Sequence, residues 1–207
     1  MRDKLFIVLR DNKMIVKVNN EDKLIEYHFN TLTSYPNIPF YVNIFELGSI
    51  FKEIKCEVLS KIRSNVKRFL KPEIFVLIDD DAMGIEKRAI IEFISITFSP
   101  KETFLVEQSA VLSPFDTKEY ISISKTCRLF VVSYIKDRKV IAQKFIDNKE
   151  LLVDELKELI KELHNDCRYK KMEIFLNGIH LKNYTEIGQL VEINELLTNA
   201  QKILMNV

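Results

Sequence analysis

The stretch that decides the fold is 4-KLFIVLRDNKMIVKVNNEDKLIEYHF-29, which contains three short apolar runs separated by polar residues. The runs are rich in β-branched and aromatic residues, and clusters of Asp, Asn and Lys between them favour tight turns, so this stretch predicts a three-stranded meander. A second stretch, 119-EYISISKTCRLFVVSYIKDRKVIAQKFI-146, follows the same plan. The sequence therefore indicates that one structural unit occurs twice.

Each meander precedes a helix, a strand and a further helix. In the first half we expect strands at Lys4–Arg10, Lys13–Val18 and Lys23–Phe29, a helix near Phe51–Leu70, a strand at Ile74–Asp79, a helix at Ile85–Phe98 and a strand at Thr103–Val106. In the second half we expect strands at Glu119–Thr126, Leu129–Lys136 and Lys139–Ile146, a helix at Lys149–Asn165, strands at Lys171–Leu176 and Val191–Ile193, and a helix at Glu195–Met205. Pro114 and Asp116 mark the boundary between predicted domains 1–116 and 117–207.

The composition is that of an ordered chain with 47% hydrophobic residues, enough for one or two cores. Its 31 basic and 30 acidic residues nearly cancel, so we expect no attraction to nucleic acid. Cys56, Cys127 and Cys167 have no metal-ligand spacing, which favours thiols in a reducing compartment and predicts no metal site. The apolar run Leu5–Leu9 is too short to span a membrane. We therefore expect a cytoplasmic protein.

Particular residues resemble a known family. Ile85-Glu86-Lys87-Arg88-Ala89-Ile90, followed by Phe104-Leu105-Val106-Glu107-Gln108, resembles the bacterial actin homologue MreB, and the segment 108–113 is similar to eukaryotic actin after its catalytic glutamine. The resemblance implies an α/β fold of the actin-like (ribonuclease H-like) kind, with duplicated βββαβα units and mixed sheets flanked by helices.

The resemblance also shows where a nucleotide site would lie. In that family, backbone amides of glycine-rich turns hold the phosphates, because any side chain would block their close approach. The first turn falls at Asp11 and the second at Ser122–Cys127, and neither contains glycine; the adenosine turn retains only Gly178. We interpret these positions as a vestigial nucleotide cleft made of Asp11, Gln108, Ser122, Lys125, Thr126, Asn177 and Gly178. The prediction is that no cofactor binds there and that catalysis is lost.

Two further clusters have two interpretations each. Asp79-Asp80-Asp81 follows a buried strand, where carboxylates either hold a metal ion or cap the next helix. The aromatic segment that contains Tyr35, Phe40, Tyr41 and Phe45 is either a docking surface for a protein partner or a loop that covers the first sheet.

Two classes of function remain open. The first is a non-catalytic actin-like scaffold or adaptor that acts through protein contacts, including contacts with itself, in a secretion, pilus or cell-shape machine. The second is a divergent MreB-like ATPase that forms filaments. A sugar or acetate kinase of the same fold is weaker, because it needs the same glycine-rich turns. The missing glycines favour the first class.

Overall fold

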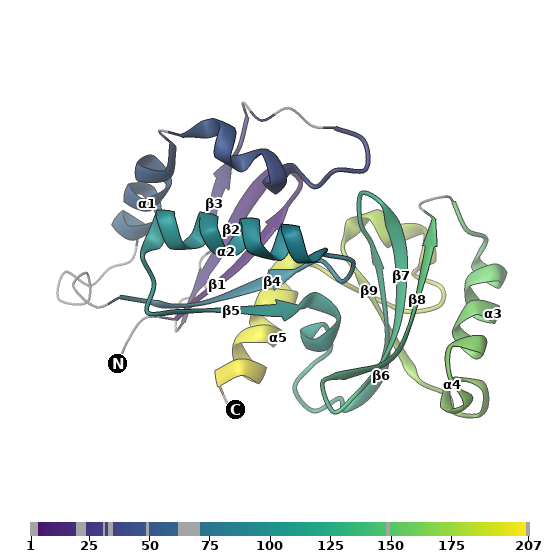
Figure 1. Ribbon diagram of the computed structural model, residues 1–207. Helices are drawn as coiled ribbons and strands as arrows, with labels where there is room; N and C mark the ends of the chain where they lie inside the picture. Colours follow the sequence, from purple (N-terminus) through teal and green to yellow (C-terminus); the bar gives the residue numbers. More distant parts are fainter. Residues whose placement is uncertain are drawn as a thin grey trace. The chain divides into compact units, whose positions relative to one another are not determined.

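The computed structural model describes residues 4–19, 24–30, 32, 35–48, 50–61, 71–147 and 150–205 of the 207-residue chain (Figure 1). The chain forms two compact units, one made of Met1–Ile78 and Ala82–Val106 and the other of Asp79–Asp81 and Glu107–Val207. The main crossing between them is at Val106–Glu107, while the sequence predicts a domain boundary at 116–117. The chain therefore leaves the first unit at Asp79, passes through the second unit as far as Asp81, and returns to the first unit at Ala82.

The first unit contains a five-stranded sheet in the order β3-β2-β1-β4-β5. Its strands are β1 (Lys4–Arg10), β2 (Lys13–Val18), β3 (Leu24–His28), β4 (Glu73–Ile78) and β5 (Glu102–Glu107). The first three form the antiparallel meander, and β4 then pairs with β1 in parallel. Alternate residues of β1, such as Leu5 and Ile7, face the same core because successive side chains point to opposite faces of a sheet.

Two helices, α1 (Ile50–Lys61) and α2 (Gly84–Phe98), and the 3₁₀ helix η1 (Phe40–Leu47) complete this unit. Residues of all three belong to the core that Leu5 and Ile7 line, among them Ile44, Ile54 and Phe93. The predicted first helix begins as expected, but its residues 62–70 lie outside the described part of the chain.

The second unit repeats the strand order. Its strands are β6 (Glu119–Lys125), β7 (Leu129–Lys136), β8 (Lys139–Asp147), β9 (Glu173–Asn177) and β10 (Gln189–Val191). The order β10-β9-β6-β7-β8 corresponds to that of the first sheet, with β6 at the centre, an antiparallel meander on one side and the parallel strand β9 on the other. The predicted duplication and the α/β fold class are confirmed.

The helices of the second unit are α3 (Val153–Leu163), α4 (Asn165–Tyr169) and α5 (Ile193–Met205), with 3₁₀ helices η3 (Gln108–Val111) and η4 (Ile179–Tyr184). The apolar side of α3, made by Leu156, Ile160 and Leu163, packs in one core with Ile121 and Ile123 of β6. Figure 1 shows α3 and α4 one after the other beside this sheet. In the described part of the chain, no helix is long and apolar enough to cross a membrane.

The predicted helix Lys149–Asn165 is wrong at both ends. His164 has extended backbone angles and ends α3, and its Nδ1 accepts a hydrogen bond from the backbone N–H of Asp166 at 3.1 Å, which caps α4. The predicted short strand at Val191–Ile193 is also displaced, because β10 ends at Val191 and α5 begins at Ile193.

Candidate functional site

The aspartate triplet, Asp79–Asp81, continues the chain directly after β4 and belongs to the second unit. The Asp80 side chain is buried and accepts two hydrogen bonds, one from the backbone N–H of Ser109 at 2.9 Å and one from the hydroxyl of Ser124 at 2.8 Å. Burial raises the pKa of the Asp80 carboxyl above its usual range, against the effect of these hydrogen bonds. Asp80 therefore joins η3 to the end of β6 through a buried carboxyl.

Asp81 binds the turn between β6 and β7, which we call the second turn (residues 126–128). Its Oδ2 accepts hydrogen bonds from the hydroxyl of Thr126 at 2.9 Å and from Nε of Arg128 at 3.0 Å, and the backbone carbonyl of Asp81 accepts one from Nη2 at 3.0 Å. The side chains of Asp81 and Arg128 are only 2% and 14% exposed. The turn at the place where the family binds a phosphate thus binds a carboxylate of the chain itself.

The backbone of the second turn is also hydrogen-bonded within the turn. The Thr126 hydroxyl oxygen accepts hydrogen bonds from the backbone N–H groups of Arg128 at 3.1 Å and Leu129 at 3.0 Å. The backbone N–H of Thr126 donates to the Leu129 carbonyl at 2.9 Å. These amides already have partners, whereas a phosphate turn needs backbone amides that point toward its ligand.

Gln108 lies at the start of η3 and is buried. Its Nε2 donates to Oδ1 of Asp79 at 3.1 Å, and its Oε1 accepts a hydrogen bond from Nδ2 of Asn177 at 2.8 Å. Both ends of the amide are therefore held by buried or half-buried neighbours. The predicted pair Gln108 and Asn177 is in direct contact, in a hydrogen-bonded chain that begins at Asp79.

Gly178, at the position expected for an adenosine turn, has a conformation that requires glycine. Gly178 follows β9 with φ 94°, and its backbone N–H donates to the carbonyl of Val191 at 3.0 Å. A side chain is strained at this positive φ, so the glycine is explained by the backbone and by the pairing with the end of β10.

The other predicted cleft residues have separate environments. The hydroxyl of Ser122 is buried and has no hydrogen-bond partner among the residues that the structure describes. The ammonium of Lys125 lies 5.1 Å from the ring centroid of Phe130, a cation–π distance. Asp11 is in the first unit, in the two-residue turn between β1 and β2.

Neither interpretation of the aspartate triplet describes what the structure shows. The N-cap of α2 is Met83, whose backbone N–H donates to Glu86 at 2.8 Å, so Asp81 does not cap this helix. Within the described ranges, no group of three His, Cys, Asp or Glu side chains has an arrangement that could hold a metal ion. The sequence signal was the acidic run after a buried strand, but its partners Ser109, Ser124 and Arg128 were missed.

The aromatic segment is corrected in part. Phe40 and Tyr41 are buried in the core of the first unit, and the Phe40 ring lies 5.5 Å from that of Phe29. Phe45 is partly buried against the same core, 6.1 Å from the ring of Phe51, while Tyr35 is 49% exposed. The segment therefore covers the first sheet, because its rings complete a core that the sheet alone leaves open.

No family model matches the chain, and no curated protein matches it either. Several solved structures, however, have a similar fold. The ethanolamine utilization protein EutJ from Carboxydothermus hydrogenoformans aligns with 99% of this chain and 90% of its own, at 11% identity and a TM-score of 0.60. A putative N-acetylglucosamine kinase from Porphyromonas gingivalis aligns over 100% of both chains, at 8% identity and a TM-score of 0.57.

MreB5 of Spiroplasma citri bound to AMPPNP aligns with 78% of this chain and 56% of its own, at 8% identity and a TM-score of 0.51. This match agrees with the actin-like fold that the resemblance to MreB implies. At such low identity, these likenesses concern the fold alone and do not carry an activity with them. The chain has the actin-like ATPase fold, built from two copies of one strand order.

Proposed function

We propose that this protein is a non-catalytic scaffold or adaptor with an actin-like fold, which acts through contacts with other proteins and with copies of itself. The observation that carries the proposal is the contact of the Asp81 carboxylate with Thr126 and Arg128. A phosphate bound at this turn would meet that carboxylate, and two negative charges held close together repel each other.

The hydrogen bonds of the Gln108 side chain support the same proposal. A glutamine that positions an attacking water needs one end of its amide directed at the reaction centre. Here Asp79 and Asn177 bind its two ends. Its role is then to join Asp79 to Asn177 within the second unit, which explains its presence without a reaction.

The proposed setting is the cytoplasm of a bacterium, in an assembly such as a secretion, pilus or cell-shape machine. Self-association is implied by the resemblance to MreB. A net charge of +1 permits close association of copies without strong repulsion.

Isothermal titration calorimetry with ATP and Mg²⁺ tests the loss of the nucleotide. We expect no saturable heat with ATP at concentrations up to about 1 mM, which corresponds to a binding free energy weaker than about −4 kcal/mol. A micromolar dissociation constant would overturn the proposal, as would ATP turnover that Gln108→Ala abolishes.

The second candidate is a divergent MreB-like ATPase that forms filaments. The match to MreB5, whose structure was solved with AMPPNP, favours it, because the fold itself is compatible with nucleotide binding. The matched variant for this alternative is Lys125→Gln, since Lys125 is the one ammonium group in the predicted cleft. An ATPase that uses this cleft should lose affinity in this variant, whereas the scaffold should show no nucleotide binding before or after the change.

A further inference from the structure

The strand β8 lies at the edge of the second sheet. It ends the order β10-β9-β6-β7-β8, so within the described ranges only the side of its backbone that faces β7 is paired with a strand. It is the longest of the four edge strands, with nine residues against five in β3, six in β5 and three in β10. A long unpaired edge presents backbone N–H and C=O groups that can pair with another strand.

The side chains of β8 alternate between a covered and an open face. Ala142 and Ile146 pack against the core that contains the apolar side of α3. Ile141 and Phe145 are 47% and 53% exposed, on the opposite face, because successive side chains of a strand point in opposite directions. Gln143 lies between them on this open face. The edge therefore carries two large apolar side chains that the chain itself leaves exposed.

The beginning of β8 contains a bulge. Tyr134 pairs with Ala142 and Ile135 pairs with Val140, so Ile141 is the extra residue. A bulge bends the strand where it lies, but from Ala142 to Asp147 the pairing with β7 is regular. A new strand therefore fits the edge from the bulge toward the end of β8.

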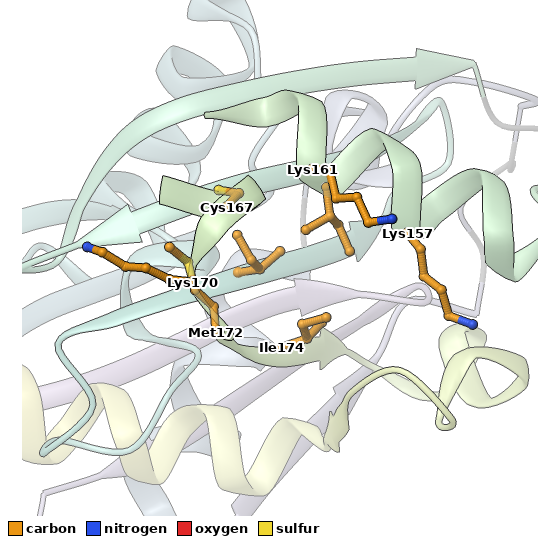
Figure 2. Close-up of a pocket in the computed structure, with 8 residues that line it drawn as sticks. Lys157, Lys161, Cys167, Lys170, Met172 and Ile174 are labelled. Atoms are coloured by element: carbon orange, nitrogen blue, oxygen red, sulfur yellow. The ribbon is translucent and has the colours of Figure 1, made fainter. Parts of the chain in front are cut away.

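The other opening in this unit has no comparable set of unpaired groups. A pocket of about 210 Å³ opens on the α3 side of the sheet (Figure 2). Each lysine of its rim already pairs with a carboxylate of the chain, and these lysines are Lys157, Lys161 and Lys170. The pocket thus offers no unpaired charge that would select a ligand.

The residues 141–145, Ile-Ala-Gln-Lys-Phe, are complementary to themselves in an antiparallel pairing centred on Gln143. In that register Ile141 of each copy lies opposite Phe145 of the other, and such apolar cross-strand pairs are stabilising. A pairing centred on Lys144 would oppose two ammonium groups, which is destabilising. A pairing centred on Phe145 would leave Ile141 without an opposite residue in β8, which ends at Asp147.

The charges at the two ends of β8 agree with the same register. Lys139 begins the strand and Asp147 ends it, and both are exposed. In the part of the chain that the structure describes, neither has an ion-pair partner. Pairing about Gln143 brings Lys139 of each copy to the end that carries Asp147 of the other. Opposite charges therefore meet twice in the pair.

We propose that β8 pairs with β8 of a second copy of this chain about a two-fold axis at Gln143, so that two five-stranded sheets join into one of ten strands. The inference rests on the self-association in the proposed function and gives it a contact site. Because the same edge is used by both copies, the contact closes as a dimer and does not extend into a filament.

Sedimentation velocity of the full chain tests the dimer. A contact made mainly by one pair of strands is small, so we expect a weak dimer with a dissociation constant of about 100 μM. The dimer fraction should then rise steadily between about 10 μM and about 1 mM protein. A protein that remains monomeric over this range would overturn the proposal.

Charged variants test the register. Ile141→Lys and Phe145→Glu should each weaken the dimer by about tenfold, because the two-fold axis repeats each change in both copies. In the double variant each new ammonium lies opposite a new carboxylate of the other copy, so affinity should return to within about threefold of the wild type. Ile179→Lys, at a similarly exposed isoleucine of η4, should have no effect. A double variant no tighter than the single ones would overturn the register, and circular dichroism confirms that each variant folds.

Cross-linking locates the two-fold axis. In a protein with Cys56→Ser and Cys127→Ser, which lacks the exposed thiols, Gln143→Cys should form a disulfide-linked dimer on oxidation, because directly opposite residues have Cβ atoms about 5 Å apart. Lys139→Cys should not, because its two copies lie at opposite ends of the pair, about 27 Å apart. The reverse result would overturn the proposal. ATP binding would overturn the loss of the nucleotide without changing sedimentation, so the two proposals can fail separately.

Discussion

The first turn (Asp11 and Asn12) and the second turn (residues 126–128) occupy equivalent places in two copies of one strand order, yet they are stabilised in different ways. Asp11 and Asn12 have φ values of 53° and 56°, which form a two-residue turn of type I′ that matches the twist of its strands. The second turn depends instead on the carboxylate of Asp81, which comes from 45 residues earlier in the chain.

The comparison teaches that a turn without glycine between the first two strands of this unit can be stabilised in two ways. In the first unit, the turn is a short hairpin whose backbone geometry is sufficient. In the second unit, three residues remain between the strands, and side chains of the chain itself occupy the hydrogen-bonding groups. The first route is local in sequence and the second depends on tertiary contacts.

The largest expected effect comes from removing the buried carboxyl of the second unit. Asp80→Ala should lower the free energy of unfolding by about 3 kcal/mol, because the N–H of Ser109 and the hydroxyl of Ser124 lose their partner inside the protein. Asp80→Asn keeps one acceptor oxygen and should cost less. Urea denaturation at pH 7 measures both, and equal losses would contradict the proposed role of the hydrogen bonds.

The same carboxyl predicts a dependence on pH. Because burial raises its folded pKa above the unfolded value, the folded protein binds more protons between these two values. This stabilisation is complete below the ordinary pKa of aspartate and is lost as pH rises through the folded pKa. We therefore expect the stability of the wild type relative to Asp80→Asn to fall over that range in urea titrations. A relative stability that rises with pH would exclude a raised pKa at Asp80.

A smaller effect is expected at the ion pair of the second turn. Asp81→Ala should cost about 2 kcal/mol, since the hydroxyl of Thr126 and Nε of Arg128 lose their acceptor inside the protein. The double variant with Arg128→Ala should cost less than the sum of the two single changes. A double-mutant cycle by thermal denaturation measures this coupling, and additive losses would show that the pair does not stabilise the turn.

The smallest effect is expected at the first turn. Asp11→Ala should cost about 1 kcal/mol, because alanine at positive φ lacks the local hydrogen bonding that lets aspartate tolerate it. Asp11→Gly, which removes the side-chain strain, should restore most of this loss. Chemical denaturation of the three proteins provides the test, and a loss at Asp11 as large as that at Asp81 would remove the contrast between the turns.

The sequence predicts the elements that depend on local signals. Both meanders follow from β-branched runs and their turn residues, and the resemblance to MreB agrees with the actin-like fold. The break at His164 was missed because α3 and α4 share one polar and apolar pattern, and only the cap that His164 provides separates them. Phe40 and Tyr41 were ambiguous because an aromatic run has the same composition on a surface and over a sheet.

The candidate site was predictable only as a set of positions. Gln108 and Asn177 were selected separately, but their contact joins residues 69 positions apart. The partners of Asp80 lie 29 and 44 positions away, and no local pattern indicates them. Such contacts depend on how Asp79–Asp81, η3 and β6 come together within the second unit, which neither composition nor periodicity determines.

Asp79–Asp81 belong to the second unit although its other residues begin only at Glu107, and this affects both folding during synthesis and the choice of fragments for expression. On the ribosome, these aspartates emerge before Ser109, Ser124 and Arg128, so their carboxylates stay hydrated until the later strands are synthesised. A fragment that begins at Glu107 would contain every strand of the second sheet but not the carboxylates that bind its second turn. Expression of the second half alone therefore requires residues 79–81 to be supplied, for example by a linker that joins them to the fragment.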